Sequence, residues 1–304
     1  MSARWVCAVA CVVAACAKHP AYMPNTQIAP LSLAADARMV TVPAGSYVAG
    51  STPEERAAAY EDFLATAGVN TAHDKSWFER EEDRHVTKLP AFRIDLMPVT
   101  QAQFAEFVAT GGAMPPTMDE ETWKSQGFAQ AYASQVARFV WHEGRPPAGR
   151  EDHPVVLVTW TDAARYCKWR GEQAGEPRRL PTAGEYEKAS RGDGGVAYPW
   201  GNTFDASKLN SGVHGHDPGG PGLPDTEPVG EHVVGASPYG VLGMAGNVFA
   251  WTASADHTPG RMIVKGSSWE DFAGVGRGAS WHGRPAGARH VIIGFRCAAD
   301  APKS

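Results

Sequence analysis

The most constraining stretch of this 304-residue chain is residues 178–201, which specify a capped helix and a sharp turn behind it. Thr182 and Glu185 have the spacing of a capping box, in which each side chain accepts a hydrogen bond from the other residue's backbone N–H. Gly192 to Gly195 end the helix. Tyr198-Pro199-Trp200-Gly201 follows as an aromatic turn, because proline presets φ and glycine tolerates the conformation after it. Many folds contain such a unit, so it predicts local structure and no function.

Other segments also predict short elements separated by irregular chain. Capping boxes are expected at Thr52 with Glu55 and at Thr100 with Gln103. The first of these helices would bury one face, formed by Tyr60, Phe63, Leu64 and Ala67. Further elements are expected as strands at 39–43, 91–96 and 155–160, the last one buried because it is almost continuously apolar, and as a helix at 162–173. The pattern contains no βαβ series and no regular sandwich spacing.

Composition limits the classes of protein that remain. The chain is 43% hydrophobic and 20% charged, which is ordinary for a globular protein of one large or two small domains. Its net charge of -5 gives no reason to expect a nucleic-acid partner. The 33 glycines, 23 prolines and 10 tryptophans indicate a loop-rich fold whose irregular backbone is held by aromatic packing.

The amino terminus predicts export. Residues 1–15 have one basic residue and an apolar core too short to span a bilayer, so we expect a signal peptide. Val13-Ala14-Ala15-Cys16 resembles a bacterial lipobox, which implies cleavage before Cys16 and lipidation of its sulfur. The alternative is an ordinary secretory signal cleaved near Ala17. With lipidation at Cys16, residues 16–38 form a lipid anchor and tether, and residues 39–300 form the folded domain. We expect this domain in the cell envelope, facing the periplasm or the surface.

Several motifs in a fixed order point to a family. Besides residues 178–201, they are Asp152 to Val156 with Trp160, Tyr166-Cys167, Tyr239 to Trp251, Lys265 to Trp269, and Gly294-Phe295-Arg296-Cys297. Together they resemble the formylglycine-generating enzyme, or sulfatase-modifying factor, family over about residues 38 to 300. The resemblance implies an α+β, C-type-lectin-like fold that is loop-rich, with sparse regular secondary structure.

Of the five cysteines, only Cys167 and Cys297 fall in the expected domain. An exported protein with two cysteines is expected to join them. The resemblance implies the same pairing, because both occupy positions that pair in family members from secretory compartments. The alternative is two buried reduced thiols.

The resemblance also separates the fold from its known chemistry. Formylglycine-generating enzymes oxidise a substrate cysteine with two cysteines that follow a Gly-Ser-Trp-like motif and hold copper. After Gly266 to Trp269, those positions are Asp271 and Gly276, which supply no thiolate. Formylglycine-generating activity and a copper cofactor are therefore not expected, and whether the chain is an enzyme stays open.

Calcium is the other metal that the resemblance implies. Asn210 and the carbonyl of Ser211 match the start of one family calcium site. A second site would lose its side-chain ligands, because Gly243 and Ala250 stand at their positions. Only the first site is therefore expected to bind calcium.

A polar pocket is expected where the family builds its substrate cleft. Its candidate residues are Ser268, Trp269, Asp271, His282, Arg284 and His290, with Arg289 beside them. Arginine next to histidine suits a carboxylate or phosphate group. The alternative is a solvated surface of charged residues.

The sequence therefore predicts an envelope-anchored binding or accessory protein whose partners are the membrane, through its lipid, and a peptide or small-molecule ligand. One alternative is a periplasmic oxidoreductase or tailoring enzyme that acts on an exported peptide or metabolite. Another is a structural component of the envelope that forms a stable complex with a protein partner. Fold alone does not decide among these functions.

Overall fold

The computed structural model describes residues 38–128, 130–215 and 225–302. The expected signal peptide, the lipid attachment at Cys16 and all but the last residue of the tether lie outside the described residues. The strands are β1 (Met39–Val42), β2 (Gly45–Ala49), β3 (His85–Leu89), β4 (Phe92–Asp95), β5 (Phe249–Ala255), β6 (Arg261–Lys265), β7 (His282–Pro285), β8 (Ile293–Phe295) and β9 (Ala298–Asp300). The α-helices are α2 (Pro53–Ala67), α3 (Thr71–Asp74), α4 (Gln101–Ala109), α5 (Glu120–Ser125), α6 (Trp160–Ala174), α7 (Ala183–Arg191) and α8 (Gly212–Gly215). Short π and 3-10 turns cover Tyr132–Val136, Ala137–Phe139, Ala206–Lys208 and Val233–Gly235.

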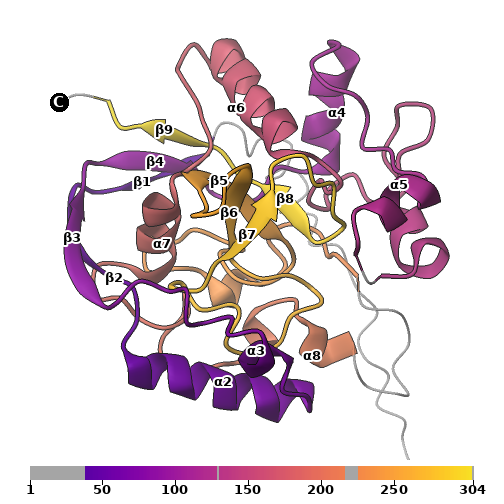
Figure 1. Ribbon diagram of the computed structural model, residues 1–304. Coiled ribbons are helices and arrows are strands. Elements are labelled where there is room, and N and C mark those ends of the chain that lie inside the picture. The colour runs from indigo at the N-terminus through magenta and orange to yellow at the C-terminus, as the bar shows by residue number, and fades with distance from the viewer. Residues whose placement is uncertain (1–37, 129, 216–224, 303–304) are drawn as a thin grey trace, which may run out of the picture.

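The strands form small sheets instead of one large one. The order β7-β6-β5-β8 makes a four-stranded sheet in which β5 and β8 run parallel, and β1-β4-β9 makes a three-stranded antiparallel sheet. The strands β2 and β3 form a separate antiparallel pair. In Figure 1, α4 and α6 lie above the four-stranded sheet in the view and α2 and α3 lie below it, and all four helices share one hydrophobic core with Trp251 of β5 and Val264 of β6.

The capping boxes predicted at Thr52, Thr100 and Thr182 start helices as expected, whereas α6 starts at Trp160, two residues before the expected position 162. Thr182 Oγ1 accepts from Glu185 N at 3.1 Å, and Glu185 Oε2 accepts from Thr182 N at 2.7 Å. Gly192, with φ +66°, ends α7, and Tyr198 and Gly201 exchange two backbone hydrogen bonds of 2.8 and 3.0 Å. Reciprocal capping boxes also begin α2, α4 and α6, at Thr52–Glu55, Thr100–Gln103 and Thr159–Asp162.

The prediction of a buried strand at residues 155–160 is wrong. The segment is buried, but Val155 N donates to Val99 O and Leu157 N donates to His290 O, so its backbone bonds with two separate segments. Leu157 has φ +59°, which breaks an extended conformation. Thr159 then caps α6. The apolar sequence correctly indicated burial here. A strand also needs one neighbouring strand that hydrogen-bonds with it along its length.

One residue of the expected buried face of α2 also differs. Phe63 is 4% exposed and packs in the main core, but Leu64 is 47% exposed. Neighbouring positions on a helix differ by about 100° around its axis, so a helix that covers the domain with a narrow stripe leaves one of them in water.

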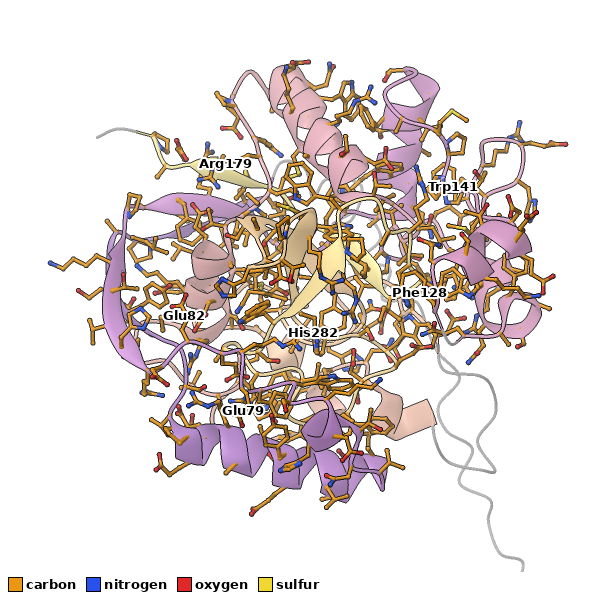
Figure 2. All side chains as sticks on the ribbon, viewed as in Figure 1. Glu79, Glu82, Phe128, Trp141, Arg179 and His282 are labelled. Carbon is orange, nitrogen blue, oxygen red and sulfur yellow. A yellow bond between two sulfur atoms is a disulfide. The ribbon has the colours of Figure 1, made fainter. Side chains whose placement is uncertain are left out.

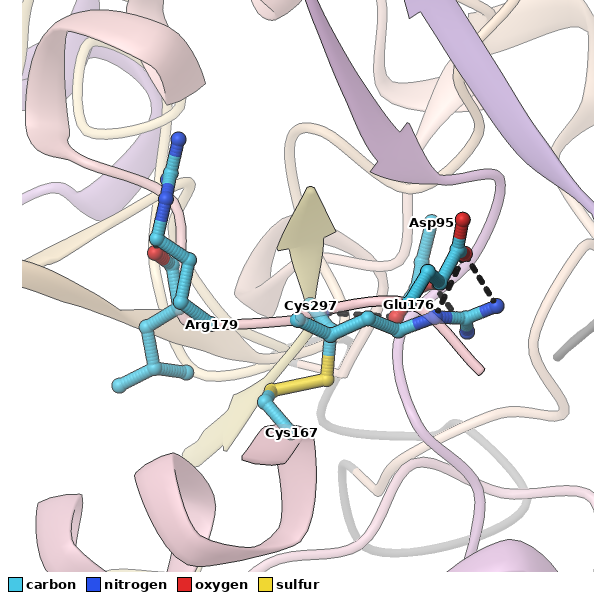
Figure 3. Close-up of a disulfide and its surroundings, with 7 residues drawn as sticks. Asp95, Cys167, Glu176, Arg179 and Cys297 are labelled. Carbon is cyan, nitrogen blue, oxygen red and sulfur yellow. Dashed lines mark hydrogen bonds and ion pairs between the residues drawn. A yellow bond between two sulfur atoms is a disulfide. The ribbon is translucent and has the colours of Figure 1, made fainter. Parts of the chain in front are cut away.

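The disulfide joins α6 to the segment that leads into β9. Cys167 and Cys297 are bonded, with Cα atoms 5.5 Å apart, and both are buried (Figure 3). Asp95 Oδ2 accepts from Cys297 N at 2.7 Å, which ties the same segment to the end of β4. The pairing expected from the sequence is therefore confirmed.

Within the described residues, no helix combines the length and the apolar character needed to cross a membrane.

Candidate ligand-binding site

A cavity of about 300 Å³ opens beside β7, at the edge of the four-stranded sheet. Strand pairing places Val264 opposite His282 and Met262 opposite Arg284, so β6 fixes the spacing of the two polar side chains on β7. His282, at the start of β7, lies near the centre of the view in Figure 2. The residues that line the cavity are Lys75, Trp77, Arg80, Arg261, Asp271, His282 and Arg284.

Asp271 is the carboxylic acid in this wall. Its Oδ2 accepts hydrogen bonds from Ser268 N at 2.8 Å and from Ser268 Oγ at 2.5 Å. Burial raises the pKa of Asp271 to about 6, while the bonds from Ser268 and the nearby charge of Arg284 act in the opposite direction. Asp271 can therefore exchange a proton close to neutral pH.

His282 contributes a neutral imidazole. It is 4% exposed, and its ring meets Trp77 and Phe249 edge-on with centroids 5.2 and 5.4 Å away. Burial holds the pKa of His282 well below its ordinary value, and the charges of Arg284 and Arg80 lower it further. The imidazole is thus uncharged at neutral pH and can donate or accept a hydrogen bond.

The rest of the wall is cationic. Arg261 is neutralised by Asp256, with Nε 3.2 Å from Oδ2. Among the described residues, no carboxylate lies within 4.0 Å of the charged groups of Lys75, Arg80 or Arg284. Burial lowers the pKa of Arg284, and Asp271 partly restores it. The cavity therefore carries a surplus of positive charge, which favours an anion.

Four of the sequence-predicted residues do not line the cavity, and two of these, Trp269 and His290, are buried among aromatic and backbone groups elsewhere. Trp269 is buried in the core, where its Nε1 donates to Val291 O at 3.3 Å. His290 packs against Phe128 and Trp123, with centroids 4.1 and 5.1 Å away, and burial lowers its pKa to about 3.

The other predicted residues divide between the cavity and its support. Asp271, His282 and Arg284 line the cavity, and Ser268 reaches it through its bonds to Asp271. Arg289 instead pairs with Asp162, with Nη2 2.8 Å from Oδ2.

Sequence reasoning missed the part of the wall that comes from the segment after α3. Lys75, Trp77 and Arg80 lie almost 200 positions before Asp271 in the chain, and no periodicity links the two segments. The only local signal is the density of basic and aromatic side chains in a segment without regular structure. Ser76 adopts φ +50° within it, a conformation that turns the backbone between Lys75 and Trp77.

Glu270, next to Asp271, faces different partners. Its Oε2 accepts from Gln130 Nε2 at 2.5 Å, and Glu270 does not line the cavity. Burial raises the pKa of Glu270 to about 7; the Gln130 bond lowers it, Asp271 raises it and Arg138 lowers it. The two adjacent acids are thus coupled by charge, but only Asp271 lines the cavity.

The donor set around Asp271 does not fit a copper site made of two thiolates. Gly276 offers no side chain, and a Cβ there would lie 3.1 Å from Ser267 Oγ. The cysteines of the described domain, Cys167 and Cys297, are joined in the disulfide. No cluster of three or more metal-binding side chains occurs among the residues that the structure describes.

Among the described residues, the polar groups around Asn210, where a calcium site is expected, include the Asp225 carboxylate and two guanidinium groups. Asn210 Nδ2 donates to Asp225 O at 2.8 Å. The Asp225 carboxylate is held by Arg150, with one bond of 2.8 Å and a second shorter one, and Arg138 lies 3.7 Å from it. Ser211 Oγ is buried without a hydrogen-bond partner among the described atoms. Two guanidinium groups thus lie beside the Asp225 carboxylate and would repel a cation held there.

Comparison with known proteins gives the lineage of this fold. The model of the sulfatase-modifying factor enzyme 1-like domain matches residues 26–301. The inactive C-alpha-formylglycine-generating enzyme 2 of Mus musculus is 34% identical over 256 residues, which cover 72% of this chain and 78% of that protein. The hercynine oxygenase of Mycolicibacterium smegmatis is 32% identical over 239 residues, which cover 70% of this chain and 51% of that enzyme.

A solved structure shows the same architecture. PvdO from Pseudomonas aeruginosa superposes with a TM-score of 0.61 at 22% identity, covering 86% of this chain and 94% of PvdO. The mixture of short helices and strands agrees with the expected α+β, C-type-lectin-like fold, so that prediction is confirmed. The match of the domain model over most of the chain shows that this protein belongs to the sulfatase-modifying factor family.

Proposed function

We propose that this protein is an envelope-anchored binding or accessory protein, whose ligand is an anionic small molecule or an anionic group of an exported peptide. The ligand occupies the cavity beside β7. The observation that carries the proposal is the cationic surplus in that cavity, where Lys75, Arg80 and Arg284 have no carboxylate within ion-pair distance among the described residues.

The charge in the cavity can be counted directly. Arg261 and Asp256 cancel, and Asp271 carries between zero and one negative charge because its pKa is about 6. Three remaining cations therefore outnumber at most one anion. A concave wall of one sign concentrates the opposite charge, and a guanidinium can donate two parallel hydrogen bonds to a carboxylate or phosphate.

Family membership alone does not select a chemistry. The relatives include one named as inactive and one named as an oxygenase. Asp271 and Gly276 stand where the resembled enzymes hold copper with cysteines, so we infer that copper-dependent formylglycine formation is not the activity of this chain.

Equilibrium titration with sulfate and with citrate tests the binding proposal. We expect Arg284→Ala to weaken binding by at least tenfold, since it removes a half-buried cation of the cavity. Arg170→Ala is the matched control, because it removes the same charge from the surface of α6, where Arg170 Nη1 lies 3.4 Å from Glu106. Equal affinity losses in the two variants, or no binding of either anion by the native protein, would refute the proposal.

A tailoring enzyme is the second candidate, and the Ser268–Asp271 pair is the observation that favours it. An acid with a pKa of about 6, hydrogen-bonded to a hydroxyl in a ligand cavity, suits general acid–base catalysis. Asp271→Asn separates the two functions: ligand binding that survives while ligand turnover is lost supports the enzyme. If the native protein turns over none of the ligands that it binds, the tailoring-enzyme function is ruled out.

The envelope anchor needs its own test. Cys16→Ser removes the only sulfur that the lipobox would lipidate. We expect the variant to leave the membrane fraction of a bacterial host, and retention there would contradict a lipid anchor at this residue.

A further inference from the structure

A second cavity, of about 380 Å³, lies on the other face of the four-stranded sheet. Side chains alternate along a strand, so Ile263 and Lys265 of β6 lie on the face of the sheet opposite to Val264. Val264 pairs with His282, which lines the first cavity, so the second cavity lies on the opposite face. The cavity lies among β2, β3, the start of α7 and the β5–β6 pair. Arg80, which lines the first cavity, lies 5.7 Å over the ring of Trp281, which lines the second. The two cavities are thus neighbours with separate walls.

Two side-chain donors in this wall are incompletely satisfied. Tyr47 is 4% exposed, and its hydroxyl has no hydrogen-bond partner among the described residues. Lys265 is 1% exposed, and within the described part of the chain it makes two long bonds, of 3.4 Å, to Glu187 Oε2 and Ala279 O. An ammonium has three donors, so this group is incompletely satisfied.

The start of α7 adds to the donors. Ala183 N donates to Ser254 Oγ at 3.0 Å, and Glu185 N donates to Thr182 Oγ1. The N–H of Gly184, between them, has no acceptor among the described residues. Helix N-termini favour negative charge through these free N–H groups.

The Glu187 carboxylate, which lines the cavity, is shared by two cations. Glu187 Oε1 accepts from Arg191 and from Gly50 N, both at 2.8 Å, and its Oε2 faces Lys265. Burial raises the pKa of Glu187, but Lys265 and Arg191 outweigh it, and the net effect lowers the pKa and keeps the carboxylate ionised. One carboxylate thus faces two cations. Glu82 also lines the cavity and is exposed to solvent, where water screens its charge; burial and the charges of Glu187 and Glu82 raise the pKa of Tyr47.

Apolar side chains complete the wall. Trp281, Ile263 and Leu89 lie around the cavity, with Ala279 and Ala255 beside them. An indole face suits an aromatic ring or a flat apolar body. A ligand for this wall needs acceptor oxygens at one end and apolar surface at the other.

We propose that this cavity is a second ligand site, which takes a small molecule with a carboxylate at one end and an aromatic body at the other. The carboxylate lies by Tyr47, Lys265 and the N–H of Gly184, and the ring lies by Trp281. The site is independent of the anion cavity beside β7, and its failure would leave that function untouched.

Calorimetric titration with indole-3-acetate, and with neutral indole-3-acetamide as its matched probe, tests the charge requirement. We expect the acid to bind at least tenfold more tightly than the amide, because only the acid places a full charge by the donors. Equal binding of the two probes, or no binding of the acid, would overturn the proposal.

Two variants test the location without breaking the buried ion pairs. Tyr47→Phe removes one hydroxyl and should weaken acid binding about tenfold. Gly184→Ala should weaken it by at least as much, because a Cβ at Gly184 would lie 3.0 Å from the Tyr47 hydroxyl and narrow the cavity. Alanine is favourable in a helix, but its Cβ presses on the Tyr47 hydroxyl, so the melting temperature of this variant is measured beside its affinity.

Arg284→Ala is the control that separates the two sites. It lies in the first cavity and should leave indole-3-acetate binding unchanged while it weakens sulfate binding. Loss of indole-3-acetate binding in this variant, or native affinity in both Tyr47→Phe and Gly184→Ala, would place the probe elsewhere and refute the second site.

Discussion

The Oγ of Ser268 lies 2.5 Å from Oδ2 of Asp271, and the backbone N–H of Ser268 donates to the same oxygen at 2.8 Å. These two bonds hold one carboxyl group in the wall of a cavity that is otherwise cationic. Burial outweighs them and raises the pKa of Asp271 to about 6. Both the stability of the fold and the charge of the cavity should therefore change with pH near neutrality.

Asp271→Asn should stabilise the fold at pH 8 and leave it almost unchanged at pH 4. The pKa of Asp271 is about 6 in the folded state against an ordinary value of 3.8, so the folded protein binds the proton more tightly. The stability linked to this proton is complete below about pH 4 and is lost as pH rises through 6. Asparagine keeps an acceptor for Ser268 without the charge, and the gain is at most about 3 kcal/mol.

Urea unfolding at both pH values measures this effect. Glu61→Gln, which removes an exposed carboxylate from α2, is the control and should show no comparable gain. A gain from Asp271→Asn that is the same at pH 4 and pH 8 would contradict the linkage.

Sulfate should bind about tenfold more tightly at pH 5 than at pH 8, because protonation of Asp271 removes the one negative charge of the cavity. Sulfate itself keeps its charge over this range, and His282 stays neutral because its pKa is well below its ordinary value. Titration of Asp271→Asn should give the stronger binding at both pH values. Glu270→Gln measures how much the neighbouring acid contributes to the pH dependence of sulfate binding. A pH dependence that persists in Asp271→Asn but disappears in Glu270→Gln would assign the effect to Glu270.

Loss of the disulfide should destabilise the domain strongly. The bridge joins residues 130 positions apart, and closing so long a loop restricts the unfolded chain by up to about 5 kcal/mol in the entropic description. The loss of stability is measured by thermal unfolding. The Cys167→Ala, Cys297→Ala double variant is compared with the native protein, and the native protein is compared with and without reductant. An unchanged melting temperature in both comparisons would show that buried packing alone holds α6 to the segment before β9.

Calcium should not stabilise the domain. The backbone carbonyl of Asp225 accepts from Asn210, and the Asp225 carboxylate is bound by Arg150 and lies 3.7 Å from Arg138. The melting temperature should therefore be the same with about 5 mM calcium chloride as with excess chelator. Calcium at about 5 mM is enough to fill a site of millimolar affinity. A rise with calcium that is lost in Asn210→Ala would establish a calcium site there.

Sequence reasoning succeeded where structure depends on nearby residues. The capping boxes at Thr182 and Thr100 form because the partner lies three positions away, so the hydrogen bonds need no other part of the chain. Reasoning failed at residues 155–160, because apolar character reports burial, and only distant partners such as Val99 and His290 decide the backbone conformation.

The ordered motifs of the sequence determined the family, the fold, the cysteine pair and the absence of thiolates at positions 271 and 276. The tertiary structure alone decided that Lys75, Trp77 and Arg80 join Asp271, His282 and Arg284 around one cavity, while Trp269 and His290 pack elsewhere. It also decided that Tyr47 and Lys265 face a second cavity on the other side of the sheet. Burial and net charge at a site depend on segments that meet only in the folded chain, so spacing along the sequence cannot report them.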